Sequence, residues 1–303
     1  MDATASPRDA GRPADAKPAR LPAWARKGSP LAPGAHAMRV LLREGALNTV
    51  CEEARCPNLG ECFSRGTATF MLLGDRCTRR CGYCSVGTAK PLPPDRDEPE
   101  RVARAAFRLG LRYVVLTSVN RDDLADGGAA HFAATIEAVR RVLPKAGIEV
   151  LTPDFKGDRP ALATVLAAEP TVFNHNIETV PRLFPRLRPQ GRYRLSLEAL
   201  AAARAIRPGV PTKSGLMLGL GETDAEVLEV LADLRASGVS IVTLGQYLRP
   251  TRDHEPVHRY VPPEVFARLE QDARRLGFEA VYAGVFVRSS YNADEVFHAR
   301  GAR

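Results

Sequence analysis

The sequence contains no cysteine after residue 84 and no apolar run that approaches the roughly 18–20 residues needed to span a membrane. The first 35 residues are rich in Pro, Ala, Gly and charge, and they lack the apolar core of a secretory signal. These absences predict a soluble, cytoplasmic protein in which residues 1–20 form a disordered basic leader. In a reducing compartment, clustered thiols bind metal more often than they form disulfides.

Aromatic residues are scarce as well, at 6% of the chain, and no nucleic-acid reader motif accompanies the net charge of +8. We therefore expect neither nucleic acid nor a membrane as a partner. Positive charge gathers in the segment PRLFPRLRPQGRYR, where an acidic protein partner, an anionic ligand and an ordinary solvated loop remain open explanations. The arginines of this segment are Arg182, Arg186, Arg188, Arg192 and Arg194.

Strand-like and helical segments alternate along the chain, which at 45% hydrophobic residues can bury the core of one large domain. About six βα units with right-handed crossovers predict parallel strands in an α/β fold, an open partial barrel of the βα type. We expect a leader at 1–20, an N-terminal extension at 21–67, the barrel at 68–278 and a C-terminal segment at 279–303. The strands are expected at 69–74, 112–119, 148–154, 171–178, 212–223 (running into a Gly-rich turn), 240–247 and 279–291, and the helices at 98–110, 131–143, 159–169, 196–206, 224–238 and 262–277.

Polar residues follow several of the expected strands, and the active sites of βα barrels form at the carboxyl ends of their strands. We therefore expect these side chains to surround one site, although His175 is equally consistent with a structural, hydrogen-bonded histidine. The residues are Thr117, Ser118, Asn120, Asn174, His175, Asn176 and Gln246.

The six cysteines form two groups of three: Cys51, Cys56 and Cys62, then Cys77, Cys81 and Cys84. A structural zinc site needs four ligands, usually in two knuckles, and neither C-x4-C-x5-C nor C-x3-C-x2-C supplies them. A cubane iron–sulfur cluster fits better, because three thiolates leave one iron open to a substrate or cofactor. A zinc-stabilised basic binding protein remains the alternative from another functional class.

The second cysteine group, with Tyr83 as its aromatic residue, resembles the C-x3-C-x-aromatic-C signature of the radical S-adenosylmethionine (SAM) enzymes. It also follows the first barrel strand, where that superfamily carries it. The resemblance implies that SAM chelates the open iron of a 4Fe-4S cluster on Cys77, Cys81 and Cys84. One electron then cleaves SAM to methionine and a 5′-deoxyadenosyl radical. Tyr83 is expected near the adenine.

Seven motifs in one order, spanning about residues 21–296, resemble the lipoyl synthase family. That resemblance implies insertion of two sulfur atoms, at C6 and C8 of an octanoyl group carried on a lysine of a lipoyl carrier domain. A biotin synthase-like enzyme or a methylthiotransferase is the nearest alternative, which the upstream cysteines and RSSY argue against. The motifs are TVCEEARCPNLGECF, CTRRCGYCSVGTAKP, VVLTSVNRDDLADGGA, VFNHNIETVPRLFPRLRP, SGLMLGLGET, LGQYLRPTRDHEPVHRYV and VRSSYNADE.

The resemblance also implies roles for particular residues. Cys51, Cys56 and Cys62 are expected to hold an auxiliary 4Fe-4S cluster that donates sulfur, with Ser290, or alternatively Ser289, as its fourth ligand. The C-terminal segment would then cross to the N-terminal extension, and the two extensions are expected to close the mouth of the barrel. Thr117, Ser118 and Asn120 are expected to reach the methionine portion of SAM. Gly219 and Gly221 are expected to let the nucleoside approach the backbone, unless they are ordinary turn glycines.

Partners follow from the same resemblance. The carriers are expected to be E2 subunits of 2-oxoacid dehydrogenases and the H protein of glycine cleavage, with flavodoxin or ferredoxin as electron donor and a cluster-repair protein. The arginine-rich segment is a candidate docking site, because such carriers tend to be acidic. Gly82-Tyr83 and Ser85 depart from the Pro-Phe and Asp expected there, but none of them is a cluster ligand.

Overall fold

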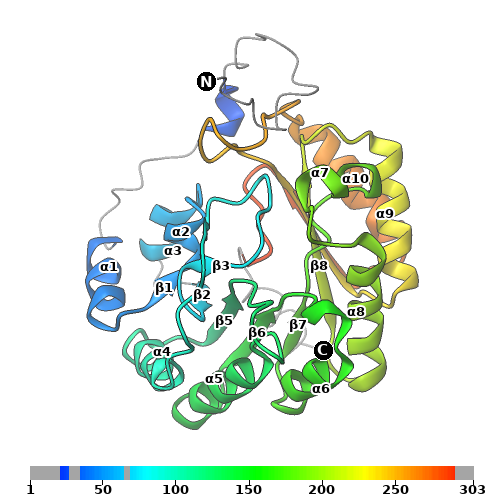
Figure 1. The fold of residues 1–303 in the computed structure, drawn as a ribbon. Coiled ribbons are helices and arrows are strands. Elements are labelled where there is room, and N and C mark those ends of the chain that lie inside the picture. The colour runs from blue at the N-terminus through cyan, green and yellow to red at the C-terminus, as the bar shows by residue number, and fades with distance from the viewer. Residues whose placement is uncertain (1–20, 27–34, 65–68, 291–303) are drawn as a thin grey trace, which may run out of the picture.

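The computed structural model describes residues 21–26, 35–64 and 69–290. Its main sheet has eight strands in the order β1-β2-β5-β6-β7-β8-β9-β10, and in Figure 1 helices cover the outside of this curved sheet. The strands are β1 (Asn48–Thr49), β2 (Thr69–Leu72), β5 (Tyr113–Ser118), β6 (Gly147–Leu151), β7 (Val172–Asn174), β8 (Thr212–Leu218), β9 (Ile241–Gln246) and β10 (Ala280–Gly284). Only β1 runs antiparallel to its neighbour, β2.

Six helices cross between successive parallel strands, which confirms the expected six βα units. β1 and β10 are the two edges of the sheet, so the barrel is open, as the sequence predicted. The pairing of β10 with β9 carries the sheet past residue 278, where we expected the barrel to end. The crossover helices are α4 (Glu98–Arg108), α5 (Ala129–Val142), α6 (Arg159–Ala167), α8 (Tyr193–Ile206), α9 (Asp224–Ala236) and α10 (Pro263–Arg275).

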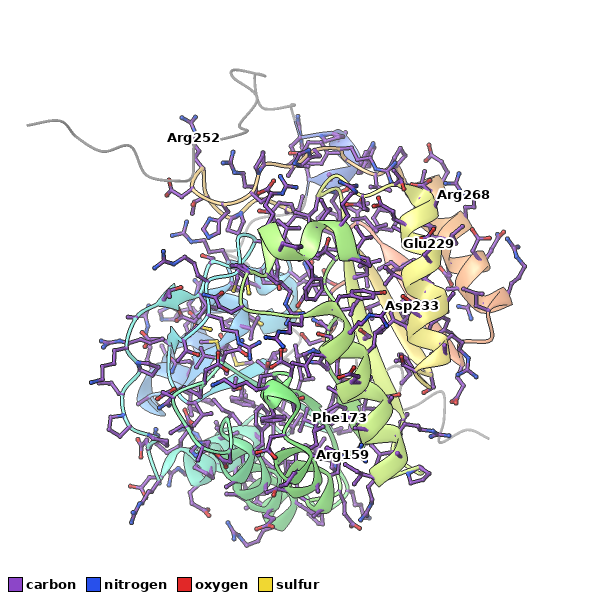
Figure 2. All side chains as sticks on the ribbon, turned by 45° about the vertical axis from the view of Figure 1, so that its right-hand side comes forward. Arg159, Phe173, Glu229, Asp233, Arg252 and Arg268 are labelled. Carbon is purple, nitrogen blue, oxygen red and sulfur yellow. The ribbon has the colours of Figure 1, made fainter. Side chains whose placement is uncertain are left out.

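The core follows from the alternation of side chains along each strand. Val114, Leu116, Ile148 and Val150 belong to one apolar cluster with side chains of the covering helices, such as Phe132. A second cluster joins β8 and β9 to α9 and α10. The outer faces of these helices are charged; in Figure 2, Glu229 and Asp233 lie on α9 and Arg268 on α10.

The inner face of the sheet carries a buried polar network between four neighbouring strands. Lys213 donates to both carboxylate oxygens of Glu149, at 3.0 and 3.1 Å. Tyr113 and Asn174 donate to the same carboxylate, each at 3.0 Å. The charges of Lys213 and Glu149 are therefore paired with each other in a place from which water is excluded. These side chains close the inside of the barrel to a ligand at the level of Glu149.

Short elements lie before and between the barrel strands. Before the barrel come η1 (Ala23–Ala25), α1 (Ala35–Glu44), α2 (Val50–Glu53) and α3 (Leu59–Ser64), the last three lying beside the β1 edge in Figure 1. Between the strands come β3 (Arg76–Cys77), β4 (Gly87–Thr88), η2 (Phe155–Gly157), η3 (Pro181–Leu183) and α7 (Phe184–Leu187). Among the described residues, no helix combines the length and apolarity of a membrane span.

Candidate functional site

The second cysteine group lies in the loop that follows β2, and this loop is fastened to the opposite side of the barrel. Gly82 donates its N–H to Leu187 O at 2.9 Å, and its carbonyl accepts from Glu255 N at 2.9 Å. His254 Nε2 donates to Cys84 O at 2.9 Å. His254 therefore holds the loop by a hydrogen bond.

Cys77 is the best-defined thiol of this group. Its Sγ accepts backbone N–H groups from Arg79, at 3.4 Å, and from Asn120, at 3.3 Å. Thr78 fixes the second donor, because its N–H and hydroxyl both donate to Asn120 O, at 3.0 and 2.9 Å. Hydrogen bonds to cysteine sulfur are one of the means by which proteins tune iron–sulfur clusters.

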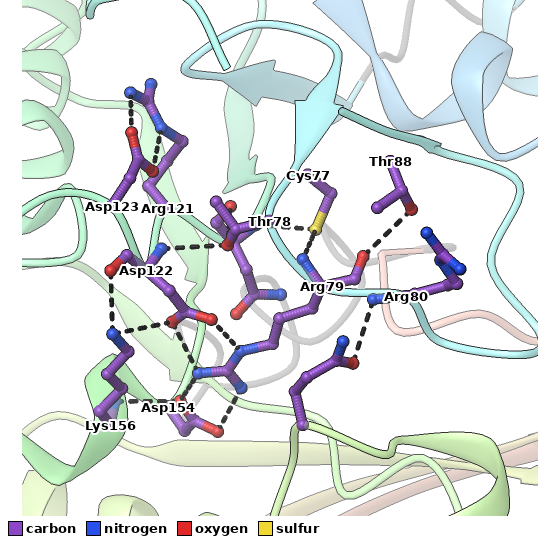
Figure 3. Close-up of polar contacts among 12 residues, drawn as sticks. Cys77, Thr78, Arg79, Arg80, Thr88, Arg121, Asp122, Asp123, Asp154 and Lys156 are labelled. Carbon is purple, nitrogen blue, oxygen red and sulfur yellow. Dashed lines mark hydrogen bonds and ion pairs between the residues drawn. The ribbon is translucent and has the colours of Figure 1, made fainter. Parts of the chain in front are cut away.

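The Arg79 side chain joins the cysteine loop to the ends of two strands, β5 and β6 (Figure 3). Its guanidinium donates to Asp122 at 2.7 and 2.9 Å and twice to Asp154 at 2.7 Å. Burial acts to raise the pKa of Asp154, but the hydrogen bonds and charge of Arg79 outweigh it and lower that pKa to about 2. Arg79 is thus a buried residue that links the cysteine loop to the ends of these strands.

Three of the thiols, those of Cys51, Cys81 and Cys84, lie in surroundings that disfavour a free thiolate. Burial raises the pKa of both Cys51 and Cys84 to about 12, against opposing hydrogen bonds from backbone N–H groups. Burial also raises the pKa of Cys81, while the charge of Arg188 opposes it. Metal binding here must therefore displace protons and supply the charge that stabilises the thiolates.

Both cysteine groups suit a cubane in the number and type of their donors. The thiols of each group lie close enough to influence one another's ionisation. Within the described ranges, however, no three His, Cys, Asp or Glu side chains converge tightly enough to share one metal ion. A single zinc needs every sulfur about 2.3 Å from one centre, whereas a cubane places each thiolate on a different iron.

Buried polar atoms without partners lie at the carboxyl ends of β5 and β7, where a polar ligand would satisfy them. Among the described residues, Ser118 Oγ, Asn120 Oδ1 and Asn176 Oδ1 have no hydrogen-bond partner. Unsatisfied buried groups of this kind are costly unless a ligand or water meets them. Thr117 differs, because its hydroxyl donates to Leu151 O at 2.8 Å and so fastens β5 to β6.

Arg188 is a site residue whose position the sequence did not predict. The sequence left an acidic partner, an anionic ligand and a solvated loop open for its segment, but Arg188 itself is only 7% exposed. Its guanidinium lies 5.1 Å from the centre of the Phe184 ring and donates to Asn176 O at 3.0 Å. Nε keeps no partner within the described residues. Phe184 begins α7 and Arg188 caps its end, four positions later, so the ring and the guanidinium meet over one short turn.

Glu178 is the second such residue, and it lies in the motif HNIET. Its φ of +68° is strained for a residue with a side chain, and Asn176 Nδ2 donates to its Oε1 at 3.1 Å. Burial raises its pKa, with Arg188 opposing. The carboxylate lies within electrostatic reach of Tyr83 and Cys81. The positive φ has no signal in the sequence, because glutamate is not a residue that favours it.

His175, by contrast, has no free ring nitrogen. Nδ1 lies 2.9 Å from Thr152 O and Nε2 lies 3.0 Å from Ser196 Oγ. Since a carbonyl only accepts, Nδ1 carries the proton and Nε2 accepts from Ser196. The residue is structural.

The chain itself explains the need for glycine at position 219. Gly219 has φ +99°, and a Cβ there would overlap the side-chain amide of Gln246 and the carbonyl of Arg259. At Gly221, with φ +107°, the nearest atoms belong to His258 at 3.5 Å. The expected contact of both glycines with the nucleoside stays a prediction.

The first cysteine group and the C-terminal segment meet at the mouth of the barrel. Asn58 Nδ2, between Cys56 and Cys62, donates to Phe286 O at 2.7 Å. Ser289 Oγ accepts from Asn176 Nδ2 at 3.2 Å. Gly245 lets this segment cross the sheet, because a Cβ there would overlap Val287 O. Burial lowers the pKa of Arg288, against the attraction of Cys56.

A cavity of about 530 Å³ opens beside this meeting point. Cys56 lines it together with apolar side chains, including Leu59, Leu248 and Phe286, and with the charged Arg39, Glu52 and Arg55. The first cysteine group is therefore reachable from outside the barrel.

Comparison with known proteins identifies the family. The Radical SAM superfamily model matches residues 71–234, which include the second cysteine group. The lipoyl synthase of Thiobacillus denitrificans is 56% identical over 93% of this chain and 91% of its own length. That of Methylococcus capsulatus is 58% identical over 92% of this chain and 87% of its own.

The chain belongs to the lipoyl synthase family. As a lipoyl synthase family member it is a radical SAM sulfurtransferase, and its superfamily uses SAM and a 4Fe-4S cluster. Membership removes the biotin synthase-like, methylthiotransferase and zinc-protein alternatives.

Solved structures agree on the fold of this lipoyl synthase family member. Methylornithine synthase matches with a TM-score of 0.55 at 14% identity, over 87% of this chain and 88% of that one. SuiB of Streptococcus suis, solved with S-adenosylmethionine bound, matches with a TM-score of 0.52 at 10% identity, over 75% of this chain and 53% of its own. Identities this low support the barrel fold alone.

Proposed function

We propose that this protein inserts sulfur at C6 and C8 of an octanoyl group amide-linked to a lysine of a lipoyl carrier domain. The main support for this proposal is that the first cysteine group contacts the C-terminal segment at the mouth of the barrel, and that the same barrel holds the second group. An unactivated C–H bond has no acidic proton for a base to remove. Radical chemistry avoids that charge, so the cofactors supply the hard step and the protein supplies position.

The second cysteine group would hold the SAM-binding cluster, and the unsatisfied polar atoms around it would hold SAM. Cys77, Cys81 and Cys84 are the proposed iron ligands. When bound, this cluster supplies the electron that cleaves SAM. The cation of Arg188, with its unpartnered Nε, suits the carboxylate of SAM.

Other side chains at the strand ends would complete the SAM site. Ser118 and Asn120 offer oxygens to the methionine portion, and Glu178 offers an acceptor beside Tyr83. Thr117, whose hydroxyl proton already serves Leu151, retains only acceptor capacity. Gly219 and Gly221 complete the proposed SAM contacts.

The auxiliary cluster would lie on Cys51, Cys56 and Cys62, with Ser290 as the fourth ligand. Ser289 is the poorer candidate, because its hydroxyl is already bonded to Asn176. A hydroxyl oxygen is a harder ligand than a thiolate and binds this iron less strongly, which suits a cluster that gives up sulfur. We assign residues 21–67 and the segment that follows β10 to this cluster, and residues 68 through the end of β10 to the SAM barrel.

The partners are proposed from the same chemistry. The carriers would be E2 subunits of 2-oxoacid dehydrogenases and the glycine cleavage H protein, with flavodoxin or ferredoxin as reductant and a cluster-repair protein. Arg182 and Arg186 are paired with Glu226 and Glu255, so the exposed Arg192 and Arg194 are the better candidates for docking an acidic carrier.

Anaerobic single turnover on an octanoyl-lysine peptide tests this function. We expect 5′-deoxyadenosine together with a dithiolated peptide, detected by mass spectrometry, and about eight irons per chain for two four-iron clusters. Cys56→Ala should keep SAM cleavage and lose sulfur insertion, whereas Cys81→Ala should lose both. Sulfur insertion that persists in Cys56→Ala would refute the proposed division of labour.

A further inference from the structure

Arg79 makes contacts that the proposed sulfur chemistry does not by itself require. It lies midway between two proposed cluster ligands, two residues after the first and two before the second. Arg79 is nevertheless buried, with only 5% of the residue exposed. Arg80, its neighbour, is exposed. A buried arginine between two ligands is therefore a specific feature of this loop rather than a general basic surface.

The guanidinium uses both edges of its planar fork. Nε and Nη2 donate to Asp122, while Nη1 and Nη2 donate to Asp154, all within 2.7–2.9 Å. Asp154 is fully buried and lies in the loop after β6, and Asp122 follows β5. Lysine carries the same charge but cannot bridge two carboxylates in this fixed geometry. The pair of aspartates therefore determines where the backbone of residue 79 lies.

The backbone of residue 79 is what touches the proposed ligand. Its N–H donates to Cys77 Sγ, and the peptide of Asn120 supplies the second N–H. Asn120 is itself fixed by Thr78, whose hydroxyl donates to Asn120 O and accepts from Asp122 N at 3.1 Å. Figure 3 shows these contacts as one network that runs from the two aspartates to the sulfur. The two N–H groups that donate to Cys77 Sγ are therefore held in place by one network of contacts, which includes Asp122 and Asp154.

We propose that Arg79, anchored by Asp122 and Asp154, is a positioning residue that sets the reduction potential of the cluster on Cys77, Cys81 and Cys84. An N–H donor stabilises the more negative, reduced state of a cluster more than the oxidised state. Holding both donors on Cys77 therefore makes the cluster easier to reduce. The inference rests on the proposed function, because it takes these three cysteines as the ligands of the SAM cluster.

The test uses full-length protein with Cys51, Cys56 and Cys62 replaced by alanine, so that only one cluster is present. Electron paramagnetic resonance during a redox titration measures the ratio of reduced to oxidised cluster. In Arg79→Lys this ratio, at a fixed solution potential, should fall about fivefold to tenfold, the effect of losing roughly one hydrogen bond. Arg80→Lys is the matched control and should titrate like its parent.

Thr78→Val provides an independent variant, because it keeps shape and charge but removes the hydroxyl bonds to Asn120 O and Asp122 N, while the N–H of residue 78 still donates to Asn120 O. It should shift the ratio in the same direction by a smaller factor. A loaded Arg79→Lys cluster that titrates like the parent would overturn the inference. If Arg79→Lys takes up no cluster, Thr78→Val decides, and an unchanged titration there overturns it equally.

The parent protein separates this inference from the function on which it rests. If the parent shows no four-iron signal that changes on adding SAM, the proposed function fails. If that signal is present and changes with SAM while the variants titrate normally, only the role of Arg79 fails.

Discussion

At the scale of single residues, the hydroxyl groups of Ser289 and Ser290 are not equivalent. Asn176 donates to Ser289 Oγ at 3.2 Å, whereas Ser290 Oγ has no hydrogen-bond partner among the described residues. Asn176 also donates to Glu178, so Ser289 belongs to the wall of the barrel mouth. That difference separates a structural serine from a candidate ligand.

Substitution of each serine by alanine should therefore have different consequences. Ser290→Ala is expected to lower sulfur insertion at least about tenfold, the loss typical of disturbing a metal site, while SAM cleavage continues. Ser289→Ala should cost only about 1 kcal/mol, the worth of one hydrogen bond, and keep most activity. Mass spectrometry of the peptide product measures both. Equal losses in the two variants would contradict the assignment.

His175 gives the stability of the protein a defined pH dependence. Burial lowers its pKa from 6.5 to about 4, with the charge of Arg188 acting in the same direction. Below about pH 6.5 the unfolded chain therefore binds more protons than the folded one. The contribution of His175 to the stability of the folded protein is complete above that pH and is lost as the pH falls toward 4. The lowered pKa of His175 changes the free energy of unfolding by at most about 3 kcal/mol over this pH range.

A His175→Gln variant should lack this dependence. Urea unfolding at a series of pH values between about 7 and 4 should show the wild type losing stability faster than the variant. The contribution of Asp154 falls at lower pH, because its pKa is lowered from 3.8 to about 2, and so does not mask the difference. Parallel pH profiles in the two proteins would count against a neutral, buried imidazole.

At this scale, the sequence predicted the roles that depend on the spacing of residues along the chain, but not those that depend on packing in the folded protein. The spacing of the six cysteines indicated two three-thiol groups, and their chemistry fits cubanes. The burial of Arg188 was not predicted, because it depends on Phe184 and on contacts with the end of β7, which no local pattern encodes.

At the scale of elements, the turn between β8 and α9 is shaped by its own glycines. A capping box of Thr223 and Glu226 begins α9, and the buried Glu222 accepts the N–H groups of Gly219 and Leu220 at 2.6 and 2.8 Å. The turn is therefore fixed by hydrogen bonds from its backbone to the Glu222 carboxylate, without any ligand.

Alanine substitutions at the two glycines should separate backbone strain from steric overlap. Gly221→Ala should lower the free energy of unfolding by about 1–2 kcal/mol, the cost of a left-handed residue. Gly219→Ala should cost about 1–3 kcal/mol more, because its Cβ also overlaps Gln246. Urea unfolding measures both. If Gly221→Ala instead weakens SAM binding without loss of stability, the nucleoside contact explains that glycine.

The six crossover helices and the parallel strands were predictable because each is long enough to show its period and ends at glycine or proline signals. The helices α2 and α3, of four and six residues, were not predicted. Segments that short show no full period, and their shape follows from packing and capping, as where Thr49 accepts from Glu52 N.

At the scale of the whole molecule, the two proposed cluster sites differ in how they are built. The loop of Cys77, Cys81 and Cys84 is fastened by partners between Asn120 and Glu255. The first cysteine group instead contacts the C-terminal segment, through Asn58 and Phe286, which lie 228 residues apart in sequence. The first site therefore depends on the end of the chain, and the second does not.

Deleting residues 286–303 should therefore remove one cluster and spare the other. We expect iron to fall from about eight to about four per chain, with SAM cleavage retained and sulfur insertion lost. Asn58→Ala, which removes a single contact with this segment, should leave both clusters in place but make the auxiliary one more sensitive to chelators. A truncated protein that keeps all its iron would show that the segment is dispensable.

The sequence predicted this closure only in outline. Order along the chain places the first cysteine group before the barrel and RSSY after it, and the resemblance joined them. The glycine at 245 that makes room for the crossing is a property of packing, visible only when Val287 lies against β9.

The contact between Asn58 and Phe286 has a consequence for biosynthesis. While the chain is being made on the ribosome, its early cysteines emerge long before the residues that cover them, and domains take shape from the N-terminus first. If the first cysteine group holds the proposed sulfur-donating cluster, that site is therefore complete only after the C-terminal segment has been made.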